Sequence, residues 1–266
     1  MTDYFRPLVQ IGPARPDAAV PLAGGWGWFT HAEVLSRSAS PRVVPATDIP
    51  ASVLARLTAA RTEIASLSLD RPRIMGILNT TPDSFSDGGQ HTAVSDAVRA
   101  GQAMVAAGAD ILDIGGESTR PGADFVPVSE EITRTLPVIA ALRGAGLRTP
   151  ISIDTRKSAV AEAAVRAGAN LVNDVSGFTF DPALGPLCQT LGLPVCVMHA
   201  QGDPATMHLD PRYDNVLLDV YDALERQIAV LEASGIPRSA ILADPGIGFG
   251  KTQEHNLALL ARLSLF

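Results

Sequence analysis

Polar side chains follow six apolar runs of strand length in this sequence, and their types suit a flat ligand with hydrogen-bond donors. They are Asn79, the run Glu117-Ser118-Thr119-Arg120, Asp154, the pair Asn173-Asp174, His199 and Asp244. Asp154 and Asp244 each end a buried run, and a carboxylate removed from water needs a donor. A guanidine-like ligand edge would supply two donors in a charge-assisted pair. Asn173 could donate or accept beside them.

The segment DPGIGFGK at residues 244–251 suggests a second chemistry, phosphate binding by a P-loop. The P-loop pattern requires glycine five places before Gly250, and Pro245 stands there instead. The segment therefore predicts a strained turn with exposed backbone rather than a nucleotide site.

Three further polar positions have less specific interpretations. His199 is the only His at a strand end and has no His at i, i+4, which argues against a metallohydrolase. Asp113 and Asp174 are interpreted as polar fill or caps at strand ends. Glu117 and Asp83 could form an acid–base pair, although nothing local fixes their geometry.

The elements that carry these residues alternate regularly from Arg73 onward. Strands are predicted at Ile74–Leu78, Ile111–Ile114, Ile151–Ile153, Leu171–Val175, Val195–Met198 and Ile241–Ala243. Helices are predicted at Ala93–Ala107, Glu130–Leu142, Ser158–Ala167, Pro182–Leu191, Tyr213–Ala233 and Gln253–Arg262. This alternation indicates parallel βαβ units. Polar residues after all six strands favour an α/β barrel, whose active sites lie at the C-terminal ends of its strands.

The first strand leads into a long polar loop, within Arg73–Gln90, that contains one isolated aromatic residue, Phe85. Residues 1–72 differ from the rest because they are rich in Pro, Gly and Ala and contain both Trp residues. They are predicted to form an accessory N-terminal extension with one helix, Ala51–Ser66. The two Trp residues are expected to anchor this extension as a covering layer on the barrel. The barrel domain is expected to span residues 73–266.

Composition excludes several classes of protein. The formal net charge of −7 argues against nucleic-acid or anionic-membrane binding. No apolar run approaches the length of a membrane span, and the N-terminus lacks the features of a signal peptide, so a cytoplasmic protein is expected. Cys188 and Cys196 are expected to be two buried thiols.

Two long loops and four shorter motifs resemble the dihydropteroate synthase family of the pterin-binding enzyme superfamily. The loops are NTTPDSFSDGG at 79–89 and GGESTRPG at 115–122. The shorter motifs are IDT at 153–155, VND at 172–174, VMH at 197–199 and DPGIGFGK at 244–251. They occur in order between about Arg73 and Phe266.

The resemblance implies a (β/α)8 barrel that joins p-aminobenzoate to 6-hydroxymethyl-7,8-dihydropterin diphosphate, with Mg²⁺ and without a protein nucleophile. Asp154, Asn173 and Asp244 would bind the pterin and Met198 would line its slot. Thr119 would contact the pterin diphosphate, and Asn79 would lie by the metal. The p-aminobenzoate pocket would be formed by Phe85, Arg120, Pro121 and Phe249, with the loop residues Asp83, Phe85 and Arg120 assisting catalysis. A homodimer is also implied.

The resemblance covers only six of the eight βα units of such a barrel. The family's Ser-Arg-Lys loop and Arg-x-His segment, which belong to the last two units, do not occur in this sequence. Two apolar sheet edges would then be open. We expect an incomplete sequence, and we expect the 266-residue chain alone to have little synthase activity when it is assayed beside one extended by two units.

Two alternatives share part of the pattern. A pterin-binding methyltransferase domain has similar Asn and Asp positions but lacks the loops of Phe85 and Arg120, so binding of p-aminobenzoate would distinguish it. A non-catalytic pterin-binding paralogue would account for the missing cations.

Overall fold

Six parallel strands form the main sheet in a computed structural model, which describes residues 3–80, 89–118, 125–202, 207 and 209–266. They are β6 (Met75–Asn79), β7 (Ile111–Gly115), β8 (Ile151–Asp154), β9 (Leu171–Asp174), β10 (Val195–Met198) and β11 (Ile241–Asp244). Each pairs in parallel with the next in chain order. All six predicted strands are therefore confirmed to within one residue at either end.

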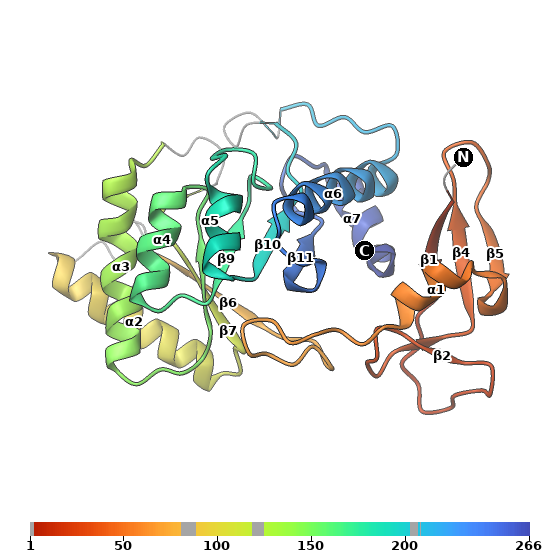
Figure 1. Ribbon diagram of the computed structural model, residues 1–266, viewed down its shortest axis with the longest axis horizontal. Helices are drawn as coiled ribbons and strands as arrows, with labels where there is room; N and C mark the ends of the chain where they lie inside the picture. The colour runs from red at the N-terminus through yellow and green to blue at the C-terminus, as the bar shows by residue number, and fades with distance from the viewer. Residues whose placement is uncertain (1–2, 81–88, 119–124, 203–206, 208) are drawn as a thin grey trace.

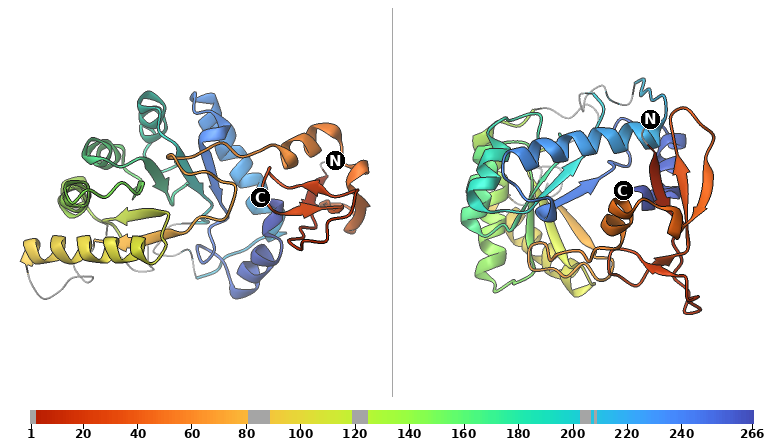
Figure 2. Two further views of the ribbon diagram at one scale, coloured as in Figure 1. Left: turned by 90° about the horizontal axis from the view of Figure 1, so that it is seen from below. Right: turned by 45° about the vertical axis from the view of Figure 1, so that its right-hand side comes forward.

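Helices connect the strands and cover one face of the sheet (Figure 2). They are α2 (Gly89–Ala106), α3 (Val128–Gly144), α4 (Ser158–Ala167), α5 (Leu184–Leu191), α6 (Val216–Ala233) and α7 (Gln253–Ala261). The six predicted helices are confirmed, with ends that shift by up to four residues. The strand–helix alternation gives the α/β barrel architecture that the sequence predicts.

The alternation of side chains along each strand separates two cores. Leu112, Ile114, Ile153, Val172 and Val197 point outward, where they pack with residues of the helices in one large cluster. The opposite set points inward. Ile111, Leu171 and Cys196 pack there with Ile64, which comes from the segment before β6 and fills the floor of the sheet.

The sheet is an open arc within the described residues. β6 and β11 each have one neighbouring strand there, and they do not pair with each other. Ile77 of β6 is 64% exposed even though its register places it on the inner face. The arc agrees with the six βα units predicted from the sequence.

The N-terminal segment forms a separate antiparallel layer beside the barrel (Figure 1). Its main sheet has the order β1 (Tyr4–Pro7), β4 (His31–Leu35) and β5 (Arg42–Pro45), and β2 (Val20–Pro21) pairs with β3 (Trp28–Phe29). These strands were not predicted, because they are short and interrupted by Pro and Gly. Trp28 is buried and anchors the layer as expected, whereas the expectation is wrong for Trp26, which is 50% exposed.

The predicted helix Ala51–Ser66 is half as long in the structure, where α1 spans Ala51–Thr58. The backbone becomes extended at Ala59, and Ile64 and Leu67 form an isolated antiparallel bridge. Ile64 is 6% exposed in the floor cluster. Burial of Ile64 and its neighbours against the barrel therefore overrides the helical periodicity.

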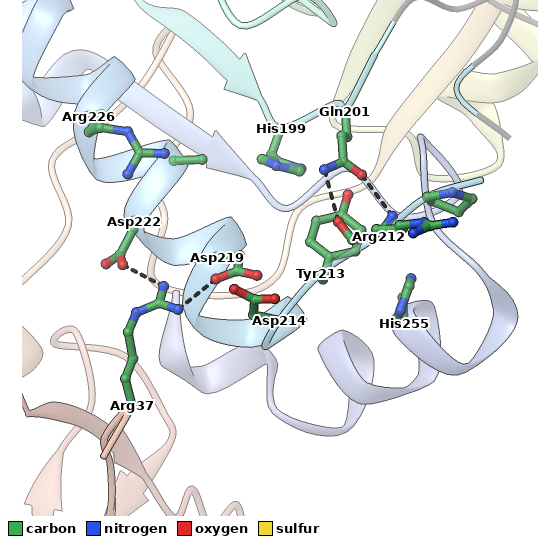
Figure 3. Close-up of a pocket in the computed structure, with 12 residues that line it drawn as sticks. Arg37, His199, Gln201, Arg212, Tyr213, Asp214, Asp219, Asp222, Arg226 and His255 are labelled. Atoms are coloured by element: carbon green, nitrogen blue, oxygen red, sulfur yellow. Dashed lines mark hydrogen bonds and ion pairs between the residues drawn. The ribbon is translucent and has the colours of Figure 1, made fainter. Parts of the chain in front are cut away.

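A polar seam joins the accessory layer to α6 (Figure 3). Arg37 donates to Asp219 at 2.7 Å and to Asp222 at 2.7 Å, and Tyr4 donates to the same Asp222 carboxylate at 2.9 Å. A pocket of about 740 Å³ lies along this seam, between Arg37, α6 and the loop after β10. Of its charged side chains, Arg37 pairs with Asp219 and Asp222, and these ion pairs join the two parts of the chain.

Candidate active site

The inward-facing set of side chains carries all four residues that were predicted to bind the pterin. Four positions form one row on the inner face because they are register partners on neighbouring strands: Asn79, Gly115, Asp154 and Asn173. Met198 and Asp244 are register partners on the same face of β10 and β11. Because all the strands are parallel, the row lies at their C-terminal ends.

Gly115 leaves room between the polar side chains of this row. A Cβ at Gly115 would lie 3.4 Å from Asp154 Oδ2 and 3.6 Å from Asn79 Oδ1. A side chain larger than methyl would therefore displace Asn79 or Asp154. The glycine keeps both oxygens accessible from the barrel mouth.

Asp154 has an uncompensated carboxylate. Within the described residues no hydrogen bond or ion pair reaches it, although its side chain is largely buried. Desolvation raises the pKa of Asp154 well above its ordinary value, and the nearby charges of Asp113 and Asp174 raise it further. A ligand that donates to this carboxylate would remove the penalty.

Asn173 contacts a residue that the sequence analysis placed outside the site. Its Nδ2 donates to Asp113 Oδ2 at 3.0 Å across the interior of the sheet. Asp113 is 4% exposed, so it is part of the inner polar cluster rather than a cap at a strand end. The alternation from Ile111 to Asp113 could have indicated this position, because Ile111 faces the barrel floor.

Asp174, in contrast, is the cap that the sequence predicts. It is fully buried and accepts from the backbone N–H groups of Ser176 at 2.7 Å and Phe178 at 2.8 Å. These bonds organise the loop after β9.

The DPGIGFGK segment forms the strained turn expected of it and holds Asp244 in place. The Gly246 N–H donates to Asp244 Oδ1 at 2.7 Å, and Gly246 has a φ of +67°. A Cβ at Gly246 would lie 2.0 Å from His199 O, so the turn packs directly on the end of β10. Phe249, expected at the p-aminobenzoate pocket, is partly exposed on this turn.

The buried side chain of Lys251 stabilises the same turn through hydrogen bonds to backbone carbonyls. Its ammonium donates to Gly246 O at 2.8 Å, Phe249 O at 2.9 Å and His199 O at 3.2 Å, and it lies 3.1 Å from His199 Nδ1. The side chain is turned to these acceptors and is 5% exposed, which is unlike the lysine of a phosphate loop.

Burial and then the charge of Lys251 lower the pKa of His199 from 6.5 to about 4. The unfolded chain therefore binds a proton at His199 between pH 6.5 and 4 while the folded chain does not. The contribution of neutral His199 to the free energy of unfolding is therefore present above pH 6.5. It is lost as the pH falls toward 4, and the loss is at most about 3 kcal/mol.

Replacing His199 with Asn should flatten this part of the pH profile, because Asn keeps an acceptor for Lys251 and cannot take up a proton. Urea unfolding at a series of pH values measures the effect. His31→Asn, at an exposed position of the accessory layer, is the control. Equal slopes for the wild type and His199→Asn would contradict the assignment.

A buried ionic network supports the base of the second loop. Lys157 donates to Glu117 at 2.9 Å, to Glu131 at 2.5 Å and to Val126 O at 2.7 Å, and Arg156 donates to both oxygens of Glu117 at 3.0 Å. Burial raises the pKa of Glu117, but bonds from Arg156, the Val126 N–H and Lys157 outweigh it and hold the pKa below its ordinary value. Glu117 is therefore a structural anion rather than the acid or base that the sequence left open.

Several predicted site residues lie outside the described residues. They are Asp83, Phe85, Thr119, Arg120 and Pro121. The described residues bring together Asn79, Asp154, Asn173, Met198 and Asp244 on one face. No group of three or more His, Cys, Asp or Glu side chains among the described residues is arranged to hold a metal ion.

Comparison with known proteins agrees with this geometry. The profile of the pterin binding enzyme family matches residues 75–266. Dihydropteroate synthase of Escherichia coli (strain K12) is 48% identical over 201 residues, covering 76% of this chain and 71% of that protein. Dihydropteroate synthase of Synechocystis sp. is 45% identical over 193 residues, covering 73% of this chain and 66% of that protein.

Solved structures of dihydropteroate synthases are also similar to this chain. Xanthomonas albilineans dihydropteroate synthase with 4-aminobenzoic acid has a TM-score of 0.70 at 48% identity, covering 76% of this chain and 72% of that chain. The same organism's enzyme in complex with 7,8-dihydropteroate has a TM-score of 0.65 at 45% identity, covering 74% and 69%. Sequence, fold and the row of inward polar groups agree, and the chain belongs to the pterin-binding enzyme family.

Proposed function

We infer that this protein condenses p-aminobenzoate with 6-hydroxymethyl-7,8-dihydropterin diphosphate to give dihydropteroate and diphosphate, a step of folate biosynthesis. Relatives named dihydropteroate synthase, and solved structures of such enzymes with 4-aminobenzoic acid and 7,8-dihydropteroate, support this activity. The observation in this chain that carries it is the Asp154 carboxylate, which is largely buried at the barrel mouth without a donor from the described residues.

The pterin fits the inward row chemically. Its 2-amino group and adjacent ring N–H are donors on one edge, and Asp154 of β8 and Asp244 of β11 are acceptors at the C-terminal ends of their strands. Asn173 contacts the heterocycle beside them. Met198, which is 4% exposed on the same face, supplies an apolar wall with a polarisable sulfur.

The p-aminobenzoate pocket is assigned by resemblance to Phe85, Arg120, Pro121 and Phe249. Arg120 would pair with the substrate carboxylate, and Phe85 and Phe249 would bracket its ring. Thr119 would contact the pterin diphosphate, and Asp83 would assist from the first loop. The network of Glu117 and Lys157 fixes the start and return of the loop that carries Thr119, Arg120 and Pro121.

Magnesium is the proposed metal, with Asn79 as its protein ligand. The exposed amide oxygen of Asn79 is a hard ligand at the mouth, and Mg²⁺ commonly combines few protein ligands with water and substrate phosphates. When bound, Mg²⁺ would neutralise charge on the leaving diphosphate.

The reaction requires positioning rather than a protein nucleophile. The bond between the pterin methylene carbon and the diphosphate oxygen breaks, the arylamine nitrogen bonds to that carbon, and the arylamine proton is released. Burial raises the pKa of Cys188 to about 12 and also raises that of Cys196, so neither thiol is a nucleophile near neutral pH. Asp154, Asn173 and Asp244 orient the pterin, and the two loops hold the amine over the methylene carbon.

Mass spectrometry of the reaction mixture tests this function. Incubation with both substrates and Mg²⁺ is expected to give 7,8-dihydropteroate, and omission of either substrate is expected to abolish it. Calorimetry should show that the chain binds both the pterin and p-aminobenzoate. Pterin binding without any p-aminobenzoate binding would favour the methyltransferase alternative, and no pterin binding would refute the assignment.

We propose three further properties. Residues 1–72 act as an accessory layer on a catalytic barrel at 73–266, supported by the seam of Arg37 with α6. The chain forms a homodimer, as the resemblance implies, and Leu257 and Leu260 of α7 are 57% and 52% exposed. The protein is cytoplasmic, in keeping with the net charge of −7 and with helices that, throughout the described residues, are too short or too polar to cross a membrane.

A further inference from the structure

The inner polar cluster contains a carboxylate that the proposed mechanism does not use. Asp113 lies on β7 two residues below the row of Gly115 and Asp154, and it is 4% exposed. Its Oδ2 accepts from Asn173 Nδ2 at 3.0 Å, whereas its Oδ1 is buried without a partner in the described residues. A buried polar group with half of its bonding capacity unused is costly to stability.

The bond from Asn173 determines which way that side-chain amide faces. A carboxylate oxygen accepts and the amide oxygen also accepts, so only the amide nitrogen of Asn173 can face Asp113. The oxygen and nitrogen of an amide point in different directions from the same trigonal carbon. The oxygen of Asn173 is therefore turned away from Asp113 and is free to accept from a ligand beside Asp154, its register partner.

We propose that Asp113 is a positioning residue which, through Asn173, sets the pattern of hydrogen-bond acceptors that selects the pterin. Asp113 fixes the Asn173 oxygen among the acceptors presented by Asp154 and Asp244. A site walled by acceptors favours a heterocycle with several donors on its edge and disfavours one that presents a carbonyl there. This inference rests on the proposed function, because it specifies how the same site chooses its ligand.

The surroundings of Asp113 agree with a role in orientation. Desolvation raises the pKa of Asp113, although Ser152 and Asn173 oppose the shift. Ser152, its register partner on β8, is fully buried beside it. The cluster therefore holds buried polar atoms beyond those needed for packing, and such groups persist where they specify a geometry.

Two substitutions at Asp113 separate orientation from packing. Asp113→Leu removes the acceptor at similar volume, so the Asn173 amide is free to turn. Asp113→Asn keeps an oxygen that can accept from Asn173. Thr135→Val is the matched control, because it removes a buried hydroxyl on α3 that donates to the Glu131 carbonyl and contacts neither Asp113 nor Asn173.

Calorimetric titration with 6-hydroxymethylpterin, and with the lumazine analogue that carries oxygen in place of the 2-amino group, measures the effect. Asp113→Leu is expected to weaken pterin binding about tenfold or more and to reduce the preference for pterin over lumazine by a similar factor. Asp113→Asn should restore most of the pterin affinity and most of the preference, and Thr135→Val should leave both unchanged. Affinity for p-aminobenzoate should not change in any variant.

Other outcomes overturn the inference in recognisable ways. Unchanged pterin preference in Asp113→Leu would refute it while leaving the proposed function intact. If Asp113→Leu does not fold, Asp113→Ala replaces it, because it also removes the acceptor; a loss of pterin affinity equal to the loss of p-aminobenzoate affinity would then indicate a purely structural role. Failure of the wild-type chain to bind the pterin would instead refute the proposed function.

Discussion

Replacing Lys157 with Met is expected to lower the free energy of unfolding by about 3–5 kcal/mol, the usual cost of leaving a buried charge without its partner. Lys157 is 4% exposed at its side chain, and its partners Glu117 and Glu131 are 7% and 0% exposed. Methionine fills a similar volume but cannot neutralise either carboxylate. Chemical denaturation at neutral pH measures the change.

The matched control is a cation that is exposed to solvent rather than buried. Arg166 is 77% exposed and pairs with Glu162 on the surface of α4, so Arg166→Met should cost less than about 1 kcal/mol. Adding Glu131→Leu to Lys157→Met should recover part of the loss, because it removes one stranded charge. The network is not a buried support if Lys157→Met is as mild as Arg166→Met.

Replacing Asp154 with Asn is expected to weaken pterin binding by about 10- to 100-fold, since hydrogen bonds to a charged group contribute about 1.5–3 kcal/mol.

The same substitution should raise the free energy of unfolding of the ligand-free protein. The pKa of Asp154 is raised in the folded state, so the folded chain holds a proton that the unfolded chain releases. Stability therefore falls as pH rises from the ordinary carboxyl pKa toward the raised one. Asparagine, which stays neutral, should make the ligand-free protein more stable at pH 7.

Asp110 provides the control for this opposed effect. It lies at the other end of β7, where its carboxylate accepts from the Ile74 N–H at 2.9 Å and from Arg73 at 3.1 Å. Asp110→Asn should lower stability and leave pterin affinity unchanged. If Asp154→Asn were to behave like Asp110→Asn, Asp154 would be a structural residue.

The sequence predicts the elements and the strand-end acceptors well because both follow from local patterns. Buried parallel strands read as apolar runs, and Asp154 and Asp244 end such runs where a barrel opens. Asp113 and Lys157 were missed for a different reason. Asp113 lies within a strand, and its role depends on Asn173, 60 residues away in sequence. Lys157 follows a strand like an ordinary surface residue, and only the approach of Glu117 and Glu131 buries it.

The accessory layer was the least predictable part of the chain. Its strands are two to five residues long, and short strands carry too few alternating positions to be recognised. The helix from Ala51 ends early for a tertiary reason, because Ile64 is buried in the barrel floor. Patterns within one segment cannot reveal a contact with another segment.

A crystal structure of the chain with 6-hydroxymethylpterin bound tests the central claim most directly. We expect the heterocycle on the inner face of the sheet, with its donor edge within hydrogen-bond distance of Asp154 and Asp244 and with Asn173 beside it. A pterin bound elsewhere, such as in the seam between Arg37 and α6, would contradict the account, and so would one that leaves Asp154 without a donor.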